Sequence, residues 1–281
     1  MPDKLAELRY EIALASRMIA YEGVLDAFGH VSARHPTDPG RYLLPRARSP
    51  ELVEPADVLE FTLDSELAGR STERQFSERV IHGEIYKARP DVMAVCHHHG
   101  SAIMPYCITG EPYAPVFHLG AAPGQVVPFW NQRDEFGDTN MLVVKREEGA
   151  SLARALGKHT MVLMRNHGAT VVAPDPRQLV FRCIYSCRNA EYQTEAKRIG
   201  TVGTLTPGEI DKASMLNFQP NVVARTWEYW TVRLGKAGEL PSRGGPAQNT
   251  AKARSLPVAR SKAGKRSSPA KRQKGKVGRK K

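Results

Sequence analysis

The stretch from Phe76 to Ser101 constrains this chain more than any other. It places His97 and His99 directly after the apolar run Val92–Cys96, which has the length and composition of a buried strand. Successive side chains of a strand point to opposite faces, so these two imidazoles should project from one face. Two imidazoles in that relation can chelate a divalent cation.

Two other residues extend this pattern into a candidate site. Glu78 lies upstream of the histidine pair, and His167 follows the apolar run Met161–Met164 and precedes a glycine, as at the end of a strand. Three imidazoles with an open coordination position are typical of a catalytic metal site. Simpler interpretations stay open: the histidine pair could be the polar end of a strand, and Glu78 could cap a helix or pair with a base.

The neighbouring histidines are predicted to have structural roles. Strand alternation turns His98 away from the pair, toward core or interface packing. His82 follows Glu78 by one turn on a helix predicted over Gln75–Ala88, so both would share one helical face.

Helical and strand patterns alternate along the chain, which predicts an α/β domain with helices covering a central sheet. Asp175 and Pro176 form a helix start for a long segment that ends at Ile199. The predicted helices cover 3–22, 75–88, 102–107, 150–156, 176–199, a segment starting near 206, and 225–234. The predicted strands cover 29–34, 42–44, 58–63, 92–96, 161–164 and 170–173.

Charge separates the chain into two parts. The formal net charge is +12, but residues 236–281 carry fifteen Lys or Arg and a single acid, so residues 1–235 are close to neutral. We predict a catalytic domain over 1–235 and a disordered basic tail over 236–281, because the tail lacks aromatic residues and cannot bury enough apolar surface to fold. The tail could contact nucleic acid non-specifically, or it could be solvated without a partner.

The rest of the composition predicts a cytoplasmic protein. No apolar run approaches the ~20 residues that span a bilayer, so no membrane association is expected. The N-terminus mixes acids and bases, unlike an export signal. The four cysteines form no CxxC pair and are expected to be reduced.

Three blocks of sequence resemble the class II aldolase/adducin family: residues 77–92 around Glu78, residues 94–100 (AVCHHHG), and residues 163–168 (LMRNHG). The resemblance implies a three-layer α/β/α domain around a mixed, mainly antiparallel sheet, in a fourfold-symmetric homotetramer. It implies that His97, His99 and His167 bind a divalent metal (Zn, Mn, Fe or Co). Glu78 would be the catalytic carboxylate or a fourth ligand.

The chain departs from the family where sugar-phosphate aldolases hold their phosphate. A glycine- and serine-rich turn has become Gly29-His30-Val31-Ser32, a second loop carries Arg46 and Arg48, and only Ser77 of a serine pair is left. Arginine suits bidentate recognition of carboxylates. The substitutions resemble the decarboxylase branch of the family, whose members act on aromatic or heteroaromatic hydroxy-carboxylates. Arg46, Arg48 and Ser77 are therefore predicted to bind the substrate, although the arginines could be simple loop charges.

The predicted function is a metal-dependent lyase that decarboxylates such a compound through an enolate-like anion. Glu78 or His30 would handle the proton, although His30 could instead only stabilise its turn. Tyr113 and His118 lie in a loop with which family members complete a neighbour's site. One alternative is an aldolase or epimerase acting on a small hydroxy-carbonyl or sugar substrate. Another is a non-enzymatic, adducin-like interaction protein that works through the basic tail.

Overall fold

The computed structural model describes residues 3–243. Across that range seven strands form one sheet, in the order β3-β2-β1-β4-β7-β6-β5. Neighbouring strands are antiparallel except for β5 and β6, which are parallel, so the predicted mixed and mainly antiparallel sheet is confirmed. The strands are β1 (His30–Arg34), β2 (Arg41–Pro45), β3 (Val58–Thr62), β4 (Ala94–His98), β5 (Phe129–Trp130), β6 (Met161–Met164) and β7 (Gly168–Ala173).

Eight α-helices accompany the sheet in the described part of the chain. They are α1 (Lys4–Tyr21), α2 (Arg79–Ala88), α3 (Met104–Thr109), α4 (Arg133–Phe136), α5 (Arg146–Leu156), α6 (Pro176–Ile199), α7 (Pro207–Asn217) and α8 (Pro220–Ala237).

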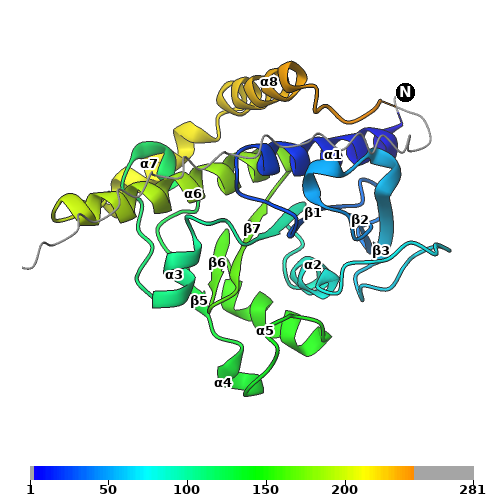
Figure 1. The fold of residues 1–281 in the computed structure, drawn as a ribbon, viewed down its shortest axis with the longest axis horizontal. Helices are drawn as coiled ribbons and strands as arrows, with labels where there is room; N and C mark the ends of the chain where they lie inside the picture. The colour runs from blue at the N-terminus through cyan, green and yellow to red at the C-terminus, as the bar shows by residue number, and fades with distance from the viewer. Residues whose placement is uncertain (1–2, 244–281) are drawn as a thin grey trace, which may run out of the picture. The chain divides into compact units, whose positions relative to one another are not determined.

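Helices cover both faces of the sheet, which confirms the three-layer α/β/α architecture (Figure 1). Alternating residues of β4 show how the layers are divided. Cys96 packs in a core with residues of α1 and α6, such as Ile184, while Val95 packs in a second core with α2 and α5, through Ile81 and Leu152. Because β4 alternates in this way, its histidines must also divide between the two faces.

The start of α6 agrees with its prediction. Asp175 accepts a hydrogen bond from the backbone N–H of Gln178, and Pro176 occupies the first turn, where its missing N–H costs nothing. The capping residue and the proline were both readable in the sequence.

The predicted start of α2 at Gln75 is wrong, because the helix begins at Arg79 and leaves Glu78 at the N-cap position. The side chain of Arg79 donates to the backbone carbonyls of Ser65 and Phe76. The backbone carbonyl of Phe76 therefore accepts a hydrogen bond from the Arg79 side chain. Glu78 therefore lies just before the helix that carries His82.

Other boundaries differ by two to five residues: α5 begins four residues earlier than predicted, at Arg146, and α8 begins five residues earlier, at Pro220. β5 and α4 were not predicted. β4 begins two residues later than predicted, at Ala94, and α3 begins two residues later, at Met104. Helix α8 continues past residue 235 to Ala237, and beyond it the Ser242 N–H donates to the carboxylate of Glu54 at 2.7 Å. The part of the predicted tail from residue 244 onward lies outside the described residues.

Two further properties bear on the composition arguments. All four cysteines are buried free thiols. Among residues 3–243, no helix combines the length and the apolar character needed to cross a membrane.

Candidate metal centre and active site

Three strands and the turns beside them bring the site histidines together. His30 on β1 lies directly opposite His97 on β4, and His97 lies opposite Thr170 on β7. His99 follows the end of β4. His167 lies in the turn between β6 and β7, where Asn166 takes the left-handed conformation (φ 52°), which asparagine tolerates better than most residues.

A glycine makes this convergence possible. A Cβ atom on Gly168 would lie 2.3 Å from the carbonyl oxygen of His98 and 2.9 Å from Cδ2 of His99. Only a residue without a side chain lets the start of β7 approach the end of β4 this closely. The His-Gly pair noted in the sequence is therefore a packing requirement as well as a turn.

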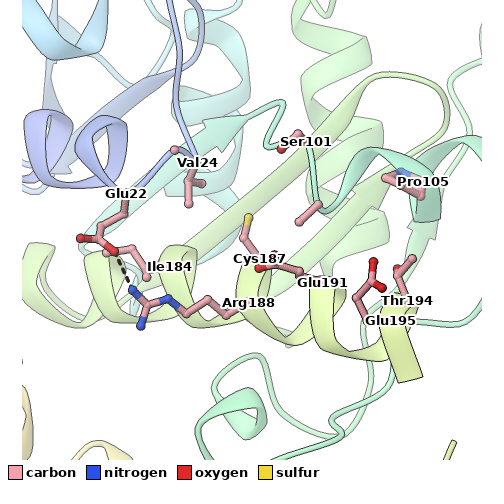
Figure 2. A pocket seen from close by; sticks show the side chains of 12 residues that line it. Glu22, Val24, Ser101, Pro105, Ile184, Cys187, Arg188, Glu191, Thr194 and Glu195 are labelled. Atoms are coloured by element: carbon pink, nitrogen blue, oxygen red, sulfur yellow. Dashed lines mark hydrogen bonds and ion pairs between the residues drawn. The ribbon is translucent and has the colours of Figure 1, made fainter. Parts of the chain in front are cut away.

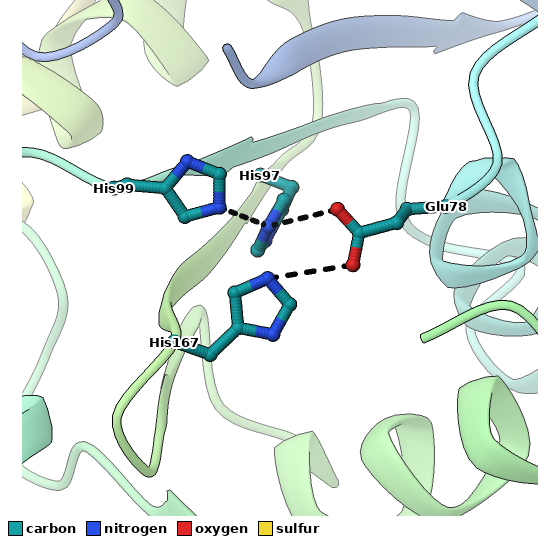
Figure 3. A group of neighbouring side chains, drawn as sticks. All are labelled: Glu78, His97, His99 and His167. Carbon is teal, nitrogen blue, oxygen red and sulfur yellow. Dashed lines mark hydrogen bonds and ion pairs between the residues drawn. The ribbon is translucent and has the colours of Figure 1, made fainter. Parts of the chain in front are cut away.

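The predicted ligands form one cluster (Figure 3). Glu78, His97, His99 and His167 each offer one ligand atom, and these atoms all lie within 4.8 Å of one another. Nε2 of His97 is 3.0 Å from Nε2 of His99. The Glu78 carboxylate oxygens lie 3.8 Å from Nε2 of His97 and 3.4 Å from Nε2 of His167.

Burial makes these imidazoles neutral. It lowers the pKa of His97 well below its usual value, lowers the pKa of His167 to about 4, and also lowers the pKa of His99. The Nδ1 atom of His97 is 3.2 Å from the Thr170 hydroxyl, which leaves Nε2 for the cluster.

Glu78 does not cap its helix, although it occupies the N-cap position. Its carboxylate accepts a hydrogen bond from the Val143 N–H at 3.0 Å instead. Burial raises the pKa of Glu78 to about 7, and the Val143 N–H acts in the opposite direction. The simple capping interpretation of Glu78 is therefore excluded.

This donor set fits a divalent cation. Neutral imidazoles offer lone pairs, and a carboxylate adds negative charge, which together are ligands that Zn²⁺ and other first-row cations accept. His98 points away, as predicted. It is completely buried, and its Nδ1 accepts a hydrogen bond from the Gly100 N–H at 3.2 Å.

His30 and His82 form a buried network that the sequence did not reveal. Nδ1 of His30 is 2.6 Å from Nε2 of His82, and Nδ1 of His82 is 2.6 Å from the Ser32 hydroxyl. The Ser32 hydroxyl is in turn 2.8 Å from the hydroxyl of Tyr86. Burial lowers the pKa of His82 to about 3, so its imidazole is neutral. The four-residue spacing of His82 and Tyr86 was the one available signal, because it places both on one face of α2.

A cavity of about 420 Å³ opens beside the cluster. Glu78, His99 and His30 line it, together with Ser77. The exposed aromatic ring of Phe28 stands at its edge. This volume lies within the usual range of small-molecule sites.

The two predicted substrate arginines lie in different positions. Arg46 and Arg48 both form ion pairs with the buried carboxylate of Asp57, at 2.6 Å and 2.8 Å. Arg48 also lines the cavity, whereas Arg46 does not. A third arginine, Arg74, lines the cavity and is exposed, and no ion pair joins it to another described residue. Sequence reasoning missed Arg74 because nothing in the local pattern distinguishes it from a surface charge.

The structure does not bring Tyr113 or His118 to the cluster within one chain. The Tyr113 hydroxyl donates to the Ser186 carbonyl on α6, and the His118 carbonyl accepts from the Asn217 amide on α7. Arg165 lines a separate cavity of about 170 Å³.

Another cavity, of about 390 Å³, runs along α6 (Figure 2). Four charged residues line it, and two of them, Glu22 and Arg188, are joined by an ion pair at 2.6 Å. Burial raises the pKa of its one thiol, Cys187, which keeps it protonated. None of the predicted site residues lines this cavity, so the cavity beside the histidine cluster is the better candidate for an active site.

Several characterised proteins resemble the chain. "Decarboxylase tropJ" of Talaromyces stipitatus is 29% identical over 240 residues, covering 76% of this chain and 89% of the relative. A 3,4-dihydroxyphthalate decarboxylase of Arthrobacter keyseri is 30% identical over 194 residues, covering 64% and 74%.

Two solved structures share the fold. An aldolase II superfamily protein from Pseudomonas syringae superimposes with a TM-score of 0.73 at 20% identity, over 87% of this chain and 98% of that one. The L-fuculose 1-phosphate aldolase of Glaciozyma antarctica gives a TM-score of 0.70, also at 20% identity, over 84% and 92%.

The family model described as the Class II Aldolase and Adducin N-terminal domain matches residues 10–194, which include the sheet and all four residues of the cluster. Its span, the shared three-layer fold and the decarboxylases among the relatives agree with one another. The chain therefore belongs to the class II aldolase and adducin family.

Proposed function

We propose that the protein is a divalent-metal-dependent decarboxylase of aromatic or heteroaromatic hydroxy-carboxylates. One observation carries the proposal: three neutral imidazoles and a buried carboxylate converge beside a cavity that arginine side chains also line. The relatives named as decarboxylases support the same reaction, and one of them is named for a dihydroxylated aromatic dicarboxylate.

His97, His99 and His167 would hold the cation, and Glu78 would be a fourth ligand at rest or would act on the substrate. When bound, such a cation stabilises negative charge that develops on substrate oxygens. The protein contributes the position of the imidazoles and largely buried surroundings, which strengthen electrostatic interactions inside the site.

Arg48 and Arg74 provide a binding surface for the substrate carboxylates. Arg48 is held in place by Asp57, so it can offer only its remaining donors to a ligand. Arg74 has all of its donors available. A carboxylate can accept two parallel hydrogen bonds from one guanidinium, which also orients the ring of the substrate. Ser77 would contribute a hydroxyl at the same wall of the cavity.

The reaction requires one proton at carbon. The bond between the ring and the carboxylate breaks, CO2 leaves, the electron pair stays on the ring carbon, and that carbon takes up a proton. Glu78 and His30 both line the cavity and are the two groups placed to supply or hold this proton.

Aldol cleavage remains the second candidate, because the same fold occurs in an L-fuculose 1-phosphate aldolase. A phosphate site needs small residues whose backbone N–H groups can approach the anion. In this chain the bulky side chains of His30, Arg48 and Arg74 line the cavity in addition to small residues such as Gly29 and Ser49. This difference favours a carboxylate substrate.

The experiment is a substrate panel run on purified protein reconstituted separately with Zn²⁺, Mn²⁺, Fe²⁺ and Co²⁺. The panel contains hydroxylated benzene and pyridine mono- and dicarboxylates, including 3,4-dihydroxyphthalate, and a set of sugar phosphates. We expect CO2 release from one or more aromatic acids and no cleavage of sugar phosphates. Cleavage of a sugar phosphate without CO2 release from any aromatic acid would contradict the proposal.

A further inference from the structure

The buried hydrogen bonds behind His30 run in a defined order from donor to acceptor. This order decides whether Nε2 of His30 carries a proton toward the cavity. Nδ1 of His30 faces His82, so Nε2 is the nitrogen left for the cavity that His30 lines. No hydrogen bond joins Nε2 to another described residue. Whether Nε2 carries a proton depends on the other members of the network.

Strand and helix geometry hold this network rigidly. His30 and Ser32 are two apart on β1 and so face the same side, opposite His82 and Tyr86, which are four apart on α2. The four side chains are buried, and Ser32 and His82 are completely so. Arg34 reinforces the end of the network, because it donates to the Tyr86 carbonyl at 2.6 Å and lies over the Tyr86 ring.

Each of the three contacts needs one proton, so the network can be arranged in only a few ways. In the first arrangement Tyr86 donates to Ser32, Ser32 donates to Nδ1 of His82, and Nε2–H of His82 donates to Nδ1 of His30. Every buried proton then has an acceptor, and the remaining proton of neutral His30 sits on Nε2.

The alternatives each leave a buried proton without an acceptor. If all directions are reversed, the Tyr86 hydroxyl must donate to a partner other than Ser32, and the described residues offer it none. If both Tyr86 and His82 donate to Ser32, the Ser32 proton is left without an acceptor. A buried donor without a partner is costly, so the first arrangement should dominate.

We infer that Tyr86, Ser32 and His82 are positioning residues that hold His30 as the Nε2–H tautomer, with its proton directed into the cavity. His30 is then a hydrogen-bond donor toward the cavity. In the decarboxylation proposed above, on which this role rests, neutral His30 donates a hydrogen bond from Nε2 to a carboxylate or hydroxyl oxygen of the substrate and keeps its proton, because losing it would leave an imidazolate. The proton that replaces CO2 on the ring carbon then comes from Glu78, which lines the same cavity. Glu78 acts at the metal side of the same cavity.

The network determines the tautomer but does not ionise Tyr86. Passing a proton from Tyr86 along the whole network would leave a buried tyrosinate, and burial raises the pKa of Tyr86. His30 therefore keeps its proton during turnover, and Glu78 regains the proton that it gives to the ring carbon from solvent or from a new substrate through the cavity. This keeps the proton balance of each turnover within the cavity.

The test reads the tautomer directly. Nitrogen NMR of the Zn²⁺-loaded full chain, labelled with ¹⁵N-histidine, distinguishes a protonated ring nitrogen from a bare one, and His30→Asn assigns the His30 signals. We expect a protonated Nε2 and a bare Nδ1. Ser32→Ala removes the group that orients His82, so the two tautomers should become comparably populated. Tyr86→Phe should shift the ratio less, because Ser32 still donates to His82.

Two matched controls separate this role from packing. Ser186→Ala also deletes a buried hydroxyl, one that donates to the Arg182 carbonyl. Tyr42→Phe deletes a buried tyrosine hydroxyl that donates to Ser65. Both controls should keep the wild-type His30 signals. A bare Nε2 in the wild type, or a Ser32→Ala variant with unchanged signals, would overturn the inference.

Kinetics give the second readout. Because the competent tautomer falls from nearly all to about half of the molecules, Ser32→Ala should lower kcat by roughly twofold or more with KM unchanged. The NMR result stands whether or not CO2 is released, so failure of the proposed reaction and failure of the tautomer assignment are distinguishable. If decarboxylation occurs and kcat of Ser32→Ala equals that of the wild type, the donor role of His30 is refuted.

Discussion

Glu78 combines two properties that a purely structural carboxylate does not need. It is buried at the start of α2, and its oxygens face two imidazoles while one accepts a backbone N–H from Val143. Replacement by glutamine preserves the shape and the acceptor for Val143 but removes the ability to exchange a proton or to balance a cation with charge.

We therefore expect Glu78→Gln to lower kcat by about 10²- to 10⁴-fold, the range for loss of a positioned acid–base group, while the metal stays bound. Kinetics and metal analysis on the same samples measure this. Glu148→Gln is the matched control, because Glu148 is also buried and also accepts backbone N–H groups, those of Val144 and Lys145. A Glu78→Gln variant with wild-type turnover would show that Glu78 takes no part in the reaction.

Arg74 offers a second test at the residue scale. Its guanidinium lines the cavity without an ion pair, so Arg74→Ala should raise KM roughly ten- to hundredfold with a smaller effect on kcat. Arg70→Ala removes an exposed arginine of the same loop that does not line the cavity, and KM should stay unchanged. Equal KM values for the two variants would remove Arg74 from the binding site.

Arg46 should behave differently from Arg74. It is bound to Asp57 and Glu73 and does not line the cavity. Its loss would act through the position of the loop and of Arg48, which shares Asp57. We therefore do not expect Arg46 to contact the substrate directly. Of the two arginines predicted from the sequence, only Arg48 keeps that role.

At the scale of elements, the site depends on how closely β7 approaches the end of β4. Gly168→Ala would place a methyl group 2.3 Å from the His98 carbonyl oxygen, so the backbone must shift. We expect a stability loss of roughly 1–3 kcal/mol from overpacking, together with weaker metal binding. Thermal unfolding and metal titration measure the two effects.

Gly208→Ala serves as the control for that substitution. Gly208 lies in the first turn of α7, and a Cβ there would meet nothing within 4 Å. Alanine also favours a helix more than glycine does, so stability should be equal or higher. Unchanged metal affinity in Gly168→Ala would show that the strand approach does not control the site.

How far the sequence could predict these elements depended on whether the signal was local. The start of α6 followed from Asp175 and Pro176, and the opposed directions of His97 and His98 followed from strand alternation. The start of α2 was misjudged because Arg79 bonds to carbonyls in an upstream loop, which no local pattern encodes. The ion pairs of Asp57 and the network behind His30 depend on tertiary contacts in the same way.

On the scale of the whole molecule, charge is concentrated at the C-terminus. Residues 244–281 carry thirteen Lys or Arg and no Asp or Glu. A truncation should retain Ser242 and Arg243, because the first bonds to Glu54 and the second lies over the Tyr10 ring at 4.2 Å.

We expect deletion of residues 244–281 to leave thermal unfolding and turnover of a small substrate unchanged, since the cluster and its cavity lie entirely within residues 3–243. If the segment contacts nucleic acid, the full chain should bind a random-sequence DNA duplex with steep salt dependence and the truncated chain should not. Aggregation or loss of turnover on truncation would instead make the segment part of the working domain.

The central claim is that the histidine cluster holds the cation on which decarboxylation depends. The most direct measurement takes metal content and CO2 release from the same preparations of wild type, His167→Ala and His98→Asn. His98→Asn is the control because His98 faces the other core and asparagine can still accept the Gly100 N–H. We predict one divalent cation per chain and CO2 release for the wild type and the control, and loss of both for His167→Ala. Full CO2 release from metal-free protein, or from His167→Ala without bound metal, would contradict the account.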